Sequence, residues 1–533
     1  MRGKEVSMKK TISLLLIILS FLLVFTSCGA ANMGSNPSSD KAGAENLNPG
    51  DYTTTTAATV RPETDEDAEF EPGVSIPDED YGKFIENEFI NVSEQAQSTF
   101  SADVDTASYA YFRKLVNQGY NMTTLKSLLN GQIRTEEMIN YFKYSYDAPQ
   151  SEGELFGVNT EIANCPWNEN AKLLVIGLQA EKIETAASNN LVFLIDVSGS
   201  MASQDKLELI KRSFSYLVQN LGEDDRVSIV TYSGKEEVVL EGCEGSKHAE
   251  IMTAINSLKA SGSTNGEAGI NKAYQIAEAN YIEGGNNRII LASDGDLNVG
   301  ISSPAELEKL ISEKKDAGVY LSVLGFGTGN YKDTTMETLA DKGNGIYYYI
   351  DGESEAERVF GEDLFSTLYT IAKDVKLQIT FDPQYVEQYR LVGYENRLLH
   401  SEDFEDDSKD AGELGSGHSV TVCYELILTE EAQQTDSSWM TLAVRYKAPD
   451  ALTGTTDEYS IGGDSYTEAP SEDFKLICAL IETSLIFRDS KFIGSITLED
   501  VLSTLDSLTL NGAEDAARRL EFKELIEKLL SLD

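Results

Sequence analysis

A short run of oxygen-bearing side chains follows a fully apolar segment near the middle of the chain. Leu191–Ile195 is apolar throughout, which is typical of a strand that a parallel sheet buries on both faces. Asp196, Ser198 and Ser200 come directly after it. Open α/β sheets keep their ligand sites at the carboxyl ends of such strands, and oxygen-only ligands favour a hard divalent cation such as Mg²⁺. The alternative is a plain strand-to-helix turn in which a serine caps the helix.

Two later loops offer ligands of the same kind. Thr264 lies in the polar stretch 261–265, between two helical patterns, and Asp294 ends the second apolar run, 288–294. Two of the three loops therefore follow expected core strands directly, and all three could supply oxygen atoms to one ion. His, Lys and Cys are missing from these loops, so the residues indicate a binding site rather than a catalytic centre with a general base.

The order Asp-x-Ser-x-Ser, distant Thr, distant Asp resembles the metal-ion-dependent adhesion site of the von Willebrand factor type A domain. The pattern maps onto Asp196, Ser198, Ser200, Thr264 and Asp294 without a departure. The resemblance implies that the hydroxyls contact the ion and that the aspartates bind it directly or through water. It further implies that a Glu or Asp of a partner protein completes the coordination. Mg²⁺ is the expected ion, with Mn²⁺ or Ca²⁺ as alternatives. The expected function is the binding of a protein ligand at this ion, and the alternatives are a metal-stabilised scaffold of the cell envelope and a metal-dependent hydrolase.

The amino-terminal 28 residues have the pattern of an export signal rather than of a folded element. A basic start precedes the apolar run 12–25, and Cys28 follows a small serine. This resembles a bacterial lipoprotein signal, in which Cys28 is lipidated; an ordinary secretory signal is the alternative. We therefore expect a lipid-anchored protein of the cell membrane or outer membrane that faces the extracytoplasmic side. The sequence does not say which membrane carries it.

Composition limits the remaining possibilities. The chain has 533 residues, of which 41% are apolar, enough for about three domains with sizeable cores. Its formal net charge of −46 disfavours nucleic acid as a partner. The four cysteines after Cys28 are far apart and lack metal-ligand spacing, so we expect single buried thiols.

The alternation of strand and helix patterns predicts an α/β fold, a doubly wound, mostly parallel six-stranded sheet inserted into a β-sandwich-like domain. A helical carboxy-terminal region completes it. The expected parts are a signal peptide 1–28, a polar and acidic linker 29–91, an amino-terminal helical segment 92–150, a β domain 151–186 plus 372–470, the von Willebrand factor A-like domain 187–371 and the helical region 471–533. Within the inserted domain the expected strands are 191–195, 227–232, 237–240, 288–292, 320–325 and 346–350, and the expected helices are 206–221, 249–259, 267–281, 304–317, 334–341 and 353–371.

Three further motifs have a simple structural interpretation. The motif DVDT at 103–106 shares residues with a phosphatase nucleophile, but we expect Asp105 or Thr106 to cap the helix 107–117. The glycines of GFGTGN at 325–330 predict a loop, because no helix opens after them with dinucleotide-binding spacing. His400 and His418 lie near an acidic loop, where surface histidines are the expected interpretation and a metal site the alternative.

The segments FSADVDTASYAYFRK and RTEEMINYF resemble the block that precedes the A domain in a bacterial lipoprotein family. GYENRLLHSEDFEDDSKDAGELGSGHSVTVCYEL resembles that family's carboxy-terminal extension.

Overall fold

The computed structural model describes residues 85–532, apart from 152, 184–186, 296–303, 328–332, 364–365, 367, 433–436, 450 and 511–514. Contacts between Cα atoms divide the chain into the units 1–73 and 74–533, and every described residue belongs to the second unit. Cys28, the apolar run before it and most of the expected linker therefore lie outside the described residues. So does the glycine-containing stretch 328–330.

A six-stranded sheet with the order β10-β9-β8-β5-β6-β7 lies in the middle of the sequence. Its strands are β5 (Asn189–Asp196), β6 (Arg226–Tyr232), β7 (Glu236–Glu244), β8 (Asn286–Ser293), β9 (Tyr320–Phe326) and β10 (Tyr347–Ile350). All neighbouring strands are parallel except β6 and β7. The expected mostly parallel sheet, with an antiparallel strand at its edge, is confirmed.

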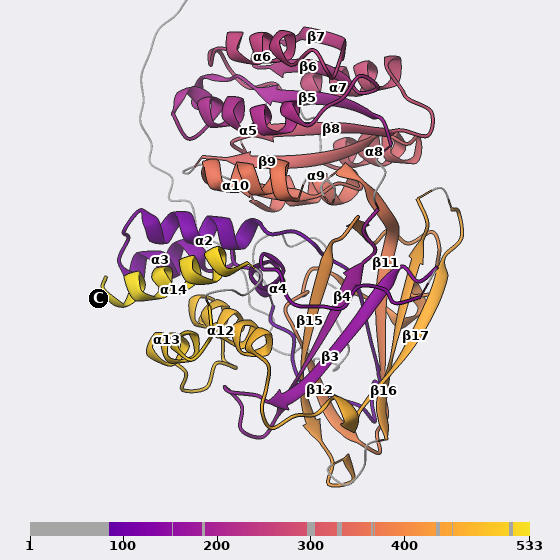
Figure 1. Ribbon diagram of the computed structural model, residues 1–533, viewed down its shortest axis with the longest axis vertical. Helices are drawn as coiled ribbons and strands as arrows, with labels where there is room; N and C mark the ends of the chain where they lie inside the picture. Colours follow the sequence, from indigo (N-terminus) through magenta and orange to yellow (C-terminus); the bar gives the residue numbers. More distant parts are fainter. Residues whose placement is uncertain are drawn as a thin grey trace, which may run out of the picture. The chain divides into compact units, whose positions relative to one another are not determined.

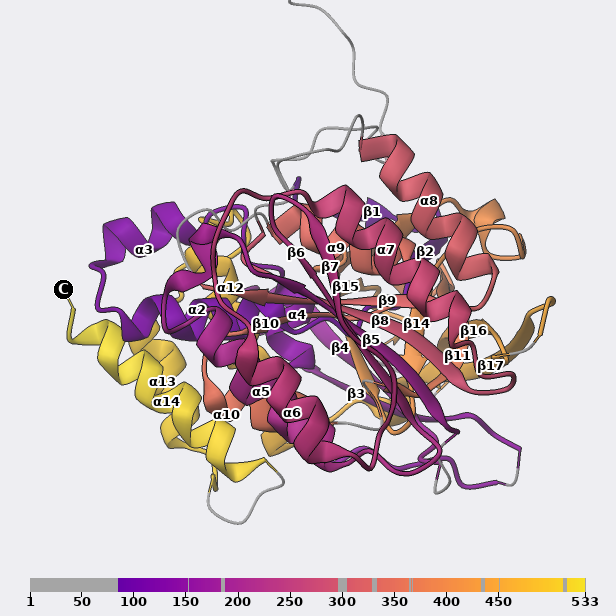
Figure 2. The same ribbon diagram turned by 90° about the horizontal axis from the view of Figure 1, so that it is seen from above.

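Helices cover both faces of this sheet, as Figure 2 shows from above. They are α5 (Leu207–Gln219), α6 (His248–Ser257), α7 (Gly266–Ala279), α8 (Pro304–Asp316), α9 (Asp333–Lys342) and α10 (Glu353–Glu357). Alternate residues of β5 explain the two layers. Phe193 stacks on Phe214 of α5, whereas Val192 and Leu194 belong to the core formed with α7 and α9. The central strand is apolar throughout because it has no solvent-facing side.

Two further sheets pack face to face below the inserted domain (Figure 1). The first has the order β1-β12-β15-β4-β3 and the second β13-β2-β11-β16-β17. Their strands are β1 (Ile90–Asn91), β2 (Gln97–Ser101), β3 (Phe156–Asn164), β4 (Lys172–Ala180), β11 (Thr370–Phe381), β12 (Val386–Val392), β13 (Leu398–Leu399), β15 (Ser419–Leu428), β16 (Ser438–Lys447) and β17 (Thr455–Gly462), and β14 (Gly412–Gly415) pairs with β11. The ring of Phe381 stacks on Tyr389 across the two sheets, so they share one core.

A layer of helices covers the other face of the first sheet. It consists of α2 (Ala107–Asn117), α3 (Met122–Leu129), α4 (Thr135–Asn140), α12 (Glu472–Phe487), α13 (Leu498–Asp506) and α14 (Ala516–Leu530). Leu173 and Val175 of β4 pack against these helices, while Leu174 and Ile176 face the second sheet. Strand β4, like β5, is apolar throughout because both of its faces are buried.

Three expectations differ from the structure. The helix expected over 353–371 ends early, because α10 passes into a π-helical turn at Arg358–Glu362 and the strand β11 begins at Thr370. The apolar spacing of Ile133, Met138, Ile139 and Phe142 predicts a second amino-terminal helix over 133–142, but the observed helix α4 is shorter and α3 precedes it. The sequence predicts sandwich strands within 154–182 and at 375–381, 389–392, 419–428 and 440–446, and β1, β13 and β17 join them unexpectedly. The amino-terminal segment also contributes β2, where FSADV predicts a short strand, so this segment is not purely helical.

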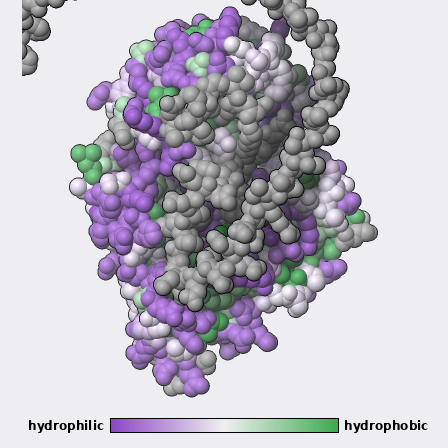
Figure 3. Space-filling model, turned by 180° about the vertical axis from the view of Figure 1, so that it is seen from behind, coloured by the Kyte–Doolittle hydropathy of each residue, from purple (hydrophilic) through white to green (hydrophobic). Residues whose placement is uncertain are grey.

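The surface and the cysteines agree with the composition. Cys165, Cys243, Cys423 and Cys478 are buried and free, as expected. The face in Figure 3 is mainly hydrophilic where described residues are visible, with isolated apolar spots. Within the described part of the chain, every helix is too short or too polar to cross a bilayer.

Candidate functional site

The five expected metal ligands come from three loops at the carboxyl ends of β5 and β8. Asp196 ends β5, Ser198 and Ser200 follow it, and Asp294 follows β8. Thr264 lies in the loop before α7. Because β5 and β8 are parallel neighbours, Asp196 and Asp294 emerge at the same edge of the sheet.

Backbone hydrogen bonds join these loops to one another. The backbone N–H of Gly199 donates to the carbonyl of Gly262 at 3.0 Å, and the N–H of Ser261 donates to the carbonyl of Val197 at 2.7 Å. Gly262 has φ +86°, a conformation that side chains rarely adopt, so a glycine is required at this close approach. The loop that carries Thr264 is thereby held against the loop that carries the two serines.

Side chains of the same loops also interact directly. The Ser198 backbone N–H donates to Asp196 Oδ1 at 2.8 Å, and the Ser293 hydroxyl donates to Asp196 Oδ2 at 3.3 Å. The hydroxyl oxygens of Ser198 and Ser200 are 3.0 Å apart. Asp196, Ser198, Thr264 and Asp294 are buried, whereas Ser200 is exposed.

This donor set fits a hard divalent cation. It offers two carboxylates and three neutral hydroxyls, all oxygen, with an exposed side at Ser200. Burial raises the pKa of Asp196 to about 6, and the neighbouring Asp294 carboxylate adds to the rise, although hydrogen bonds from Ser198 oppose it. Burial and the Asp196 carboxylate also raise the pKa of Tyr232, which lies beneath the site. A cation held by Asp196 and Asp294 would offset the repulsion between the two carboxylates. The assignment of these five residues as ligands stays a prediction.

Sequence reasoning missed a lysine at this site. Lys206 directly precedes α5, and its Nζ donates to Asp294 Oδ2 at 2.7 Å and to the Ser200 carbonyl at 3.1 Å. Its side chain is 13% exposed, and its stem lies against Gly327. Lys206 is the last residue of the connection between β5 and α5, so the expectation that these loops contain no lysine is wrong for the loop that carries the two serines.

The amino-terminal helix α2 reaches the same edge of the sheet. Lys114 of α2 donates to Asp205 at 3.3 Å, one residue before Lys206. Tyr111 packs edge-on against Tyr349 of β10 with ring centroids 5.5 Å apart. Arg113 forms an ion pair of 2.5 Å with Asp351, directly after β10. The segment before the inserted domain therefore supports the rim of the candidate metal site.

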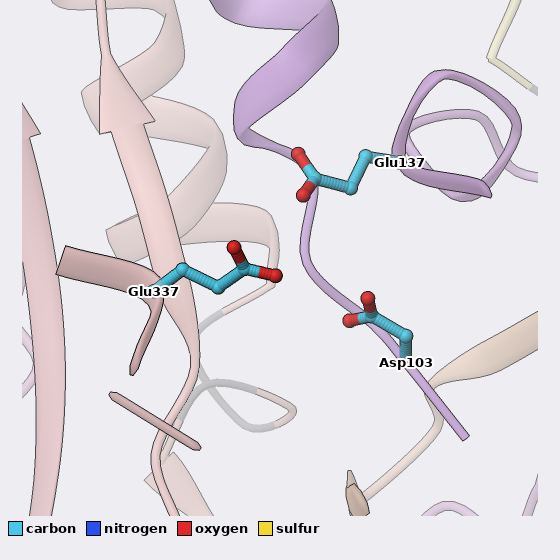
Figure 4. Close-up of side chains that lie close together, drawn as sticks. All are labelled: Asp103, Glu137 and Glu337. Atoms are coloured by element: carbon cyan, nitrogen blue, oxygen red, sulfur yellow. The ribbon is translucent and has the colours of Figure 1, made fainter. Parts of the chain in front are cut away.

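A second group of acidic residues is buried where the amino-terminal segment, the inserted domain and the sandwich meet. Figure 4 shows the carboxylates of Asp103, Glu137 and Glu337 pointing toward one another, and their ligand atoms lie within 4.8 Å. Two arginines pair with them: Arg134 with Glu137 at 2.9 Å and with Glu337, and Arg397 with Asp103 at 3.0 Å. These contacts give the group a structural explanation as an ion network that joins three parts of the chain.

This network corrects the interpretation of DVDT. The hydroxyl of Thr106 accepts a hydrogen bond from Arg358 at 3.0 Å and makes no capping bond to α2; the Ser108 backbone N–H in the first turn of α2 donates instead to the distant Glu137 carboxylate at 2.7 Å. Asp105 Oδ1 instead accepts from the backbone N–H of Tyr347 in β10 at 2.8 Å. The motif fastens the amino-terminal segment to the inserted domain, a long-range role that local capping rules do not foresee.

The two candidate histidines serve no common site. Among the described residues, the group that could hold a metal contains neither His400 nor His418. His400 lies at the start of a short 3₁₀ turn, where its backbone N–H donates to Asp403 at 3.0 Å. Burial lowers the pKa of His418 to about 4, so its ring is neutral at pH 7.

Comparisons with known proteins agree with this architecture. The von Willebrand factor type A domain family matches residues 190–362, and a family described as von Willebrand factor matches residues 75–175. A third family, described as the C-terminal part of the uncharacterized protein YfbK, matches residues 366–532. The three matches together cover most of the described chain.

Individual relatives differ in how much of the chain they share. The chain is 38% identical over 473 residues to the uncharacterized protein YfbK of Escherichia coli (strain K12), covering 84% of this chain and 80% of that protein. It is 30% identical over 196 residues to the human inter-alpha-trypsin inhibitor heavy chain H3, covering 34% of this chain and 21% of that protein. Among solved structures, a von Willebrand factor type A protein from Catenulispora acidiphila matches with 16% identity and a TM-score of 0.41, over 73% of this chain and 89% of that one.

Proposed function

Because this chain belongs to the family of von Willebrand factor type A domain proteins that includes YfbK, we propose that it binds a protein ligand through a divalent cation. Domains of this type are generally protein-interaction modules, and the proteins that carry them are generally not enzymes. The finer proposal is that Asp196, Ser198, Ser200, Thr264 and Asp294 hold the ion. A Glu or Asp of the partner would then complete its coordination.

One observation carries this proposal. Two carboxylates and three hydroxyls from three loops gather at one edge of the central sheet, and the exposed Ser200 leaves that group open on one side. Neutral hydroxyls remove little of the charge of a divalent ion, so the ion stays attractive to an outside carboxylate. Mg²⁺ is the proposed ion, and Mn²⁺ or Ca²⁺ would suit the same oxygen donors.

The test combines metal removal with one matched substitution. Immobilised protein is incubated with envelope extract of the source cell in Mg²⁺ or in EDTA, and the bound proteins are compared. Asp196→Ala should abolish Mg²⁺-dependent capture, while Asp224→Ala should leave it intact, because Asp224 is exposed and precedes β6 at the opposite end of the sheet. Capture that is equal in Mg²⁺, in EDTA and with Asp196→Ala would remove the proposal.

A separate calorimetric titration distinguishes partner binding from a structural role of the metal. In the structural alternative, Mg²⁺ binds and raises the melting temperature, but no partner depends on it. In the proposed function, the captured partner loses affinity when one of its own acidic residues is neutralised. Both alternatives lose Mg²⁺ binding in Asp196→Ala, so the partner substitution decides between them.

We also propose that Cys28 carries a lipid that anchors the protein to the cell membrane or outer membrane, on the extracytoplasmic side. The sequence pattern around Cys28 is the support for this proposal. Metabolic labelling with a radioactive fatty acid tests it. Label that is incorporated into the wild type and lost in Cys28→Ala is expected, and label that persists in Cys28→Ala would refute it.

A further inference from the structure

Lys206 places a positive charge at the open side of the candidate metal site. Its Nζ donates to Asp294 Oδ2 at 2.7 Å and to the backbone carbonyl of Ser200 at 3.1 Å. Asp294 is a buried member of the expected ligand set, whereas Ser200 is its exposed member. The ammonium group therefore lies between a buried carboxylate and the side from which a partner would approach.

Packing holds the lysine in this place. Its stem lies against Gly327, where φ is +79° and a Cβ atom would collide with the Lys206 side chain. The Tyr349 hydroxyl donates to the Gly327 carbonyl, and the Tyr349 ring packs edge-on against Tyr111 of α2. Only 13% of the Lys206 side chain is exposed. Lys206 is therefore a fixed part of the site rather than a mobile lysine of the surface.

The acid next to this lysine in the sequence is already engaged. Asp205 Oδ1 accepts from the Ser203 hydroxyl at 2.6 Å, and its Oδ2 accepts from Lys114 of α2 at 3.3 Å. The carboxylate that pairs with Lys206 is instead Asp294. A divalent cation at the site would draw on that same carboxylate, so the charge of Lys206 would lose part of its compensation.

The charges of a metal-loaded site follow from these pairs. The two carboxylates of Asp196 and Asp294 offset the two charges of a divalent ion, and Asp205 offsets Lys114. Among the described residues of the three loops, the ammonium of Lys206 then adds one positive charge without a carboxylate of its own. Because the whole chain has a formal net charge of −46, this local positive charge would select for an anionic group at the open side.

The distances suit one carboxylate that touches both cations. A Mg²⁺ ion about 2.1 Å from Asp294 Oδ2 would lie within about 5 Å of the Lys206 ammonium, which is 2.7 Å from the same oxygen. A carboxylate can bridge such a pair, with one oxygen about 2.1 Å from the ion and the other about 2.8 Å from the ammonium. An amide cannot, because its nitrogen does not accept a hydrogen bond from an ammonium group.

We propose that Lys206 recognises the partner's acid group together with the metal ion. The ion binds one carboxylate oxygen, and the Lys206 ammonium donates a hydrogen bond to the other. This inference rests on the proposed function and adds to it a residue that determines specificity: Lys206 makes the site select a charged Glu or Asp over Gln or Asn. It also assigns opposite effects to one side chain, since its charge repels the ion but attracts the partner.

The experiment uses a defined probe instead of an unidentified partner. N-acetylglutamate α-amide, labelled with ¹³C at its side-chain carboxylate, is titrated into the protein at saturating Mg²⁺ and in EDTA, and its carboxylate resonance is followed by NMR. Lys206→Met should weaken Mg²⁺-dependent binding of the probe by about three- to tenfold, because a charge-assisted hydrogen bond is lost. Isothermal titration should show that the variant binds Mg²⁺ at least as tightly as the wild type. Lys206→Arg should restore most of the probe binding, since a guanidinium also donates to carboxylates.

Lys211→Met is the matched control. Lys211 lies on α5, its side chain is 12% exposed, and it pairs with Glu208. Its substitution should leave the binding of both Mg²⁺ and the probe unchanged. N-acetylglutamine α-amide is the neutral probe and should bind neither the wild type nor Lys206→Met.

The outcomes separate this inference from the function on which it rests. Equal probe affinity in the wild type and in Lys206→Met at saturating Mg²⁺ would overturn the role of Lys206 and leave the metal-dependent function intact. The same holds if Lys206→Arg binds the probe as weakly as Lys206→Met, or if Lys211→Met weakens it equally. A wild type that binds Mg²⁺ but shows no difference in probe binding between Mg²⁺ and EDTA would overturn the proposed function, and this inference with it.

Discussion

Removing the positive charge of Lys206 should strengthen metal binding at the candidate site. The Lys206 ammonium lies 2.7 Å from Asp294 Oδ2, and a cation bound to that carboxylate would lie within about 5 Å of the ammonium. Repulsion between a divalent ion and a unit charge at about 5 Å is about 1.7 kcal/mol at the dielectric constant of water and about 7 kcal/mol at an effective value of 20. Solvent reaches only the 13% of the Lys206 side chain that is exposed, so the lower value is the minimum expected repulsion.

Lys206→Met should therefore raise the affinity for Mg²⁺ by about ten- to thirtyfold, equivalent to about 1.5–2 kcal/mol. Methionine keeps the apolar stem that packs at Gly327. Isothermal titration with Mg²⁺ measures the change, and Lys211→Met on the same helix is the control, since Lys211 pairs with Glu208 instead. Unchanged or weaker binding in Lys206→Met would show that the lysine organises Asp294 for the metal rather than competing with it.

Three further predictions concern stability. The pKa of His418 is about 4 in the folded protein, below its ordinary value of 6.5, so the stability that the neutral ring contributes is fully present above about pH 6.5 and is lost as the pH falls toward 4. The free energy of unfolding in urea should therefore fall between pH 7.5 and pH 4.5, and His418→Gln should make this fall smaller by roughly 2–3 kcal/mol. The same fall in the wild type and in His418→Gln would contradict this prediction. Arg390→Met should lower the free energy of unfolding by about 3–5 kcal/mol, because the buried Glu425 carboxylate then lacks its guanidinium partner. Adding Glu425→Gln should recover part of this loss, and effects of the two substitutions that simply add would argue against the ion pair. Phe193→Ala should lower the free energy of unfolding by about 3–5 kcal/mol, because the stacked contact with Phe214 is lost. The substitution Leu452→Ala at an exposed position is the control and should leave stability unchanged. A loss under about 1 kcal/mol in Phe193→Ala would mean that the surrounding core fills the gap.

The inserted domain was predictable because its strands and helices alternate and its core strands are apolar on both faces. Leu191–Ile195 and Arg288–Ala292 lie within β5 and β8, and the expected ends of most helices differ from the observed ends by one or two residues. The candidate site followed from the same pattern, since parallel strands bring their carboxyl ends together. Strand β17 escaped notice because it is an edge strand whose exposed residues show no apolar alternation.

Long-range contacts were beyond the sequence patterns. Asp103 and Arg397 are 294 positions apart, and Lys206 reaches Asp294 across 88 positions. Local sequence rules predict that Asp105 or Thr106 caps the helix. In the structure both side chains instead accept hydrogen bonds from distant residues, Asp105 from Tyr347 and Thr106 from Arg358. The end of the helix expected over 353–371 was predicted too late in the sequence, because apolar residues keep a helical spacing up to the start of strand β11.

The connections of the inserted domain have a mechanical consequence. The chain enters after β4 and returns into β11, and both connections bind one turn: the Gly417 N–H donates to the Glu181 carbonyl at 2.9 Å, and the Ser416 N–H donates to the Tyr369 carbonyl at 2.9 Å. A tethered partner that pulls on the edge of the candidate metal site would load two covalent links that share a single anchor point. Tension would then pass into β4 and β11 together, one strand in each sheet of the sandwich, rather than peel either sheet from its margin.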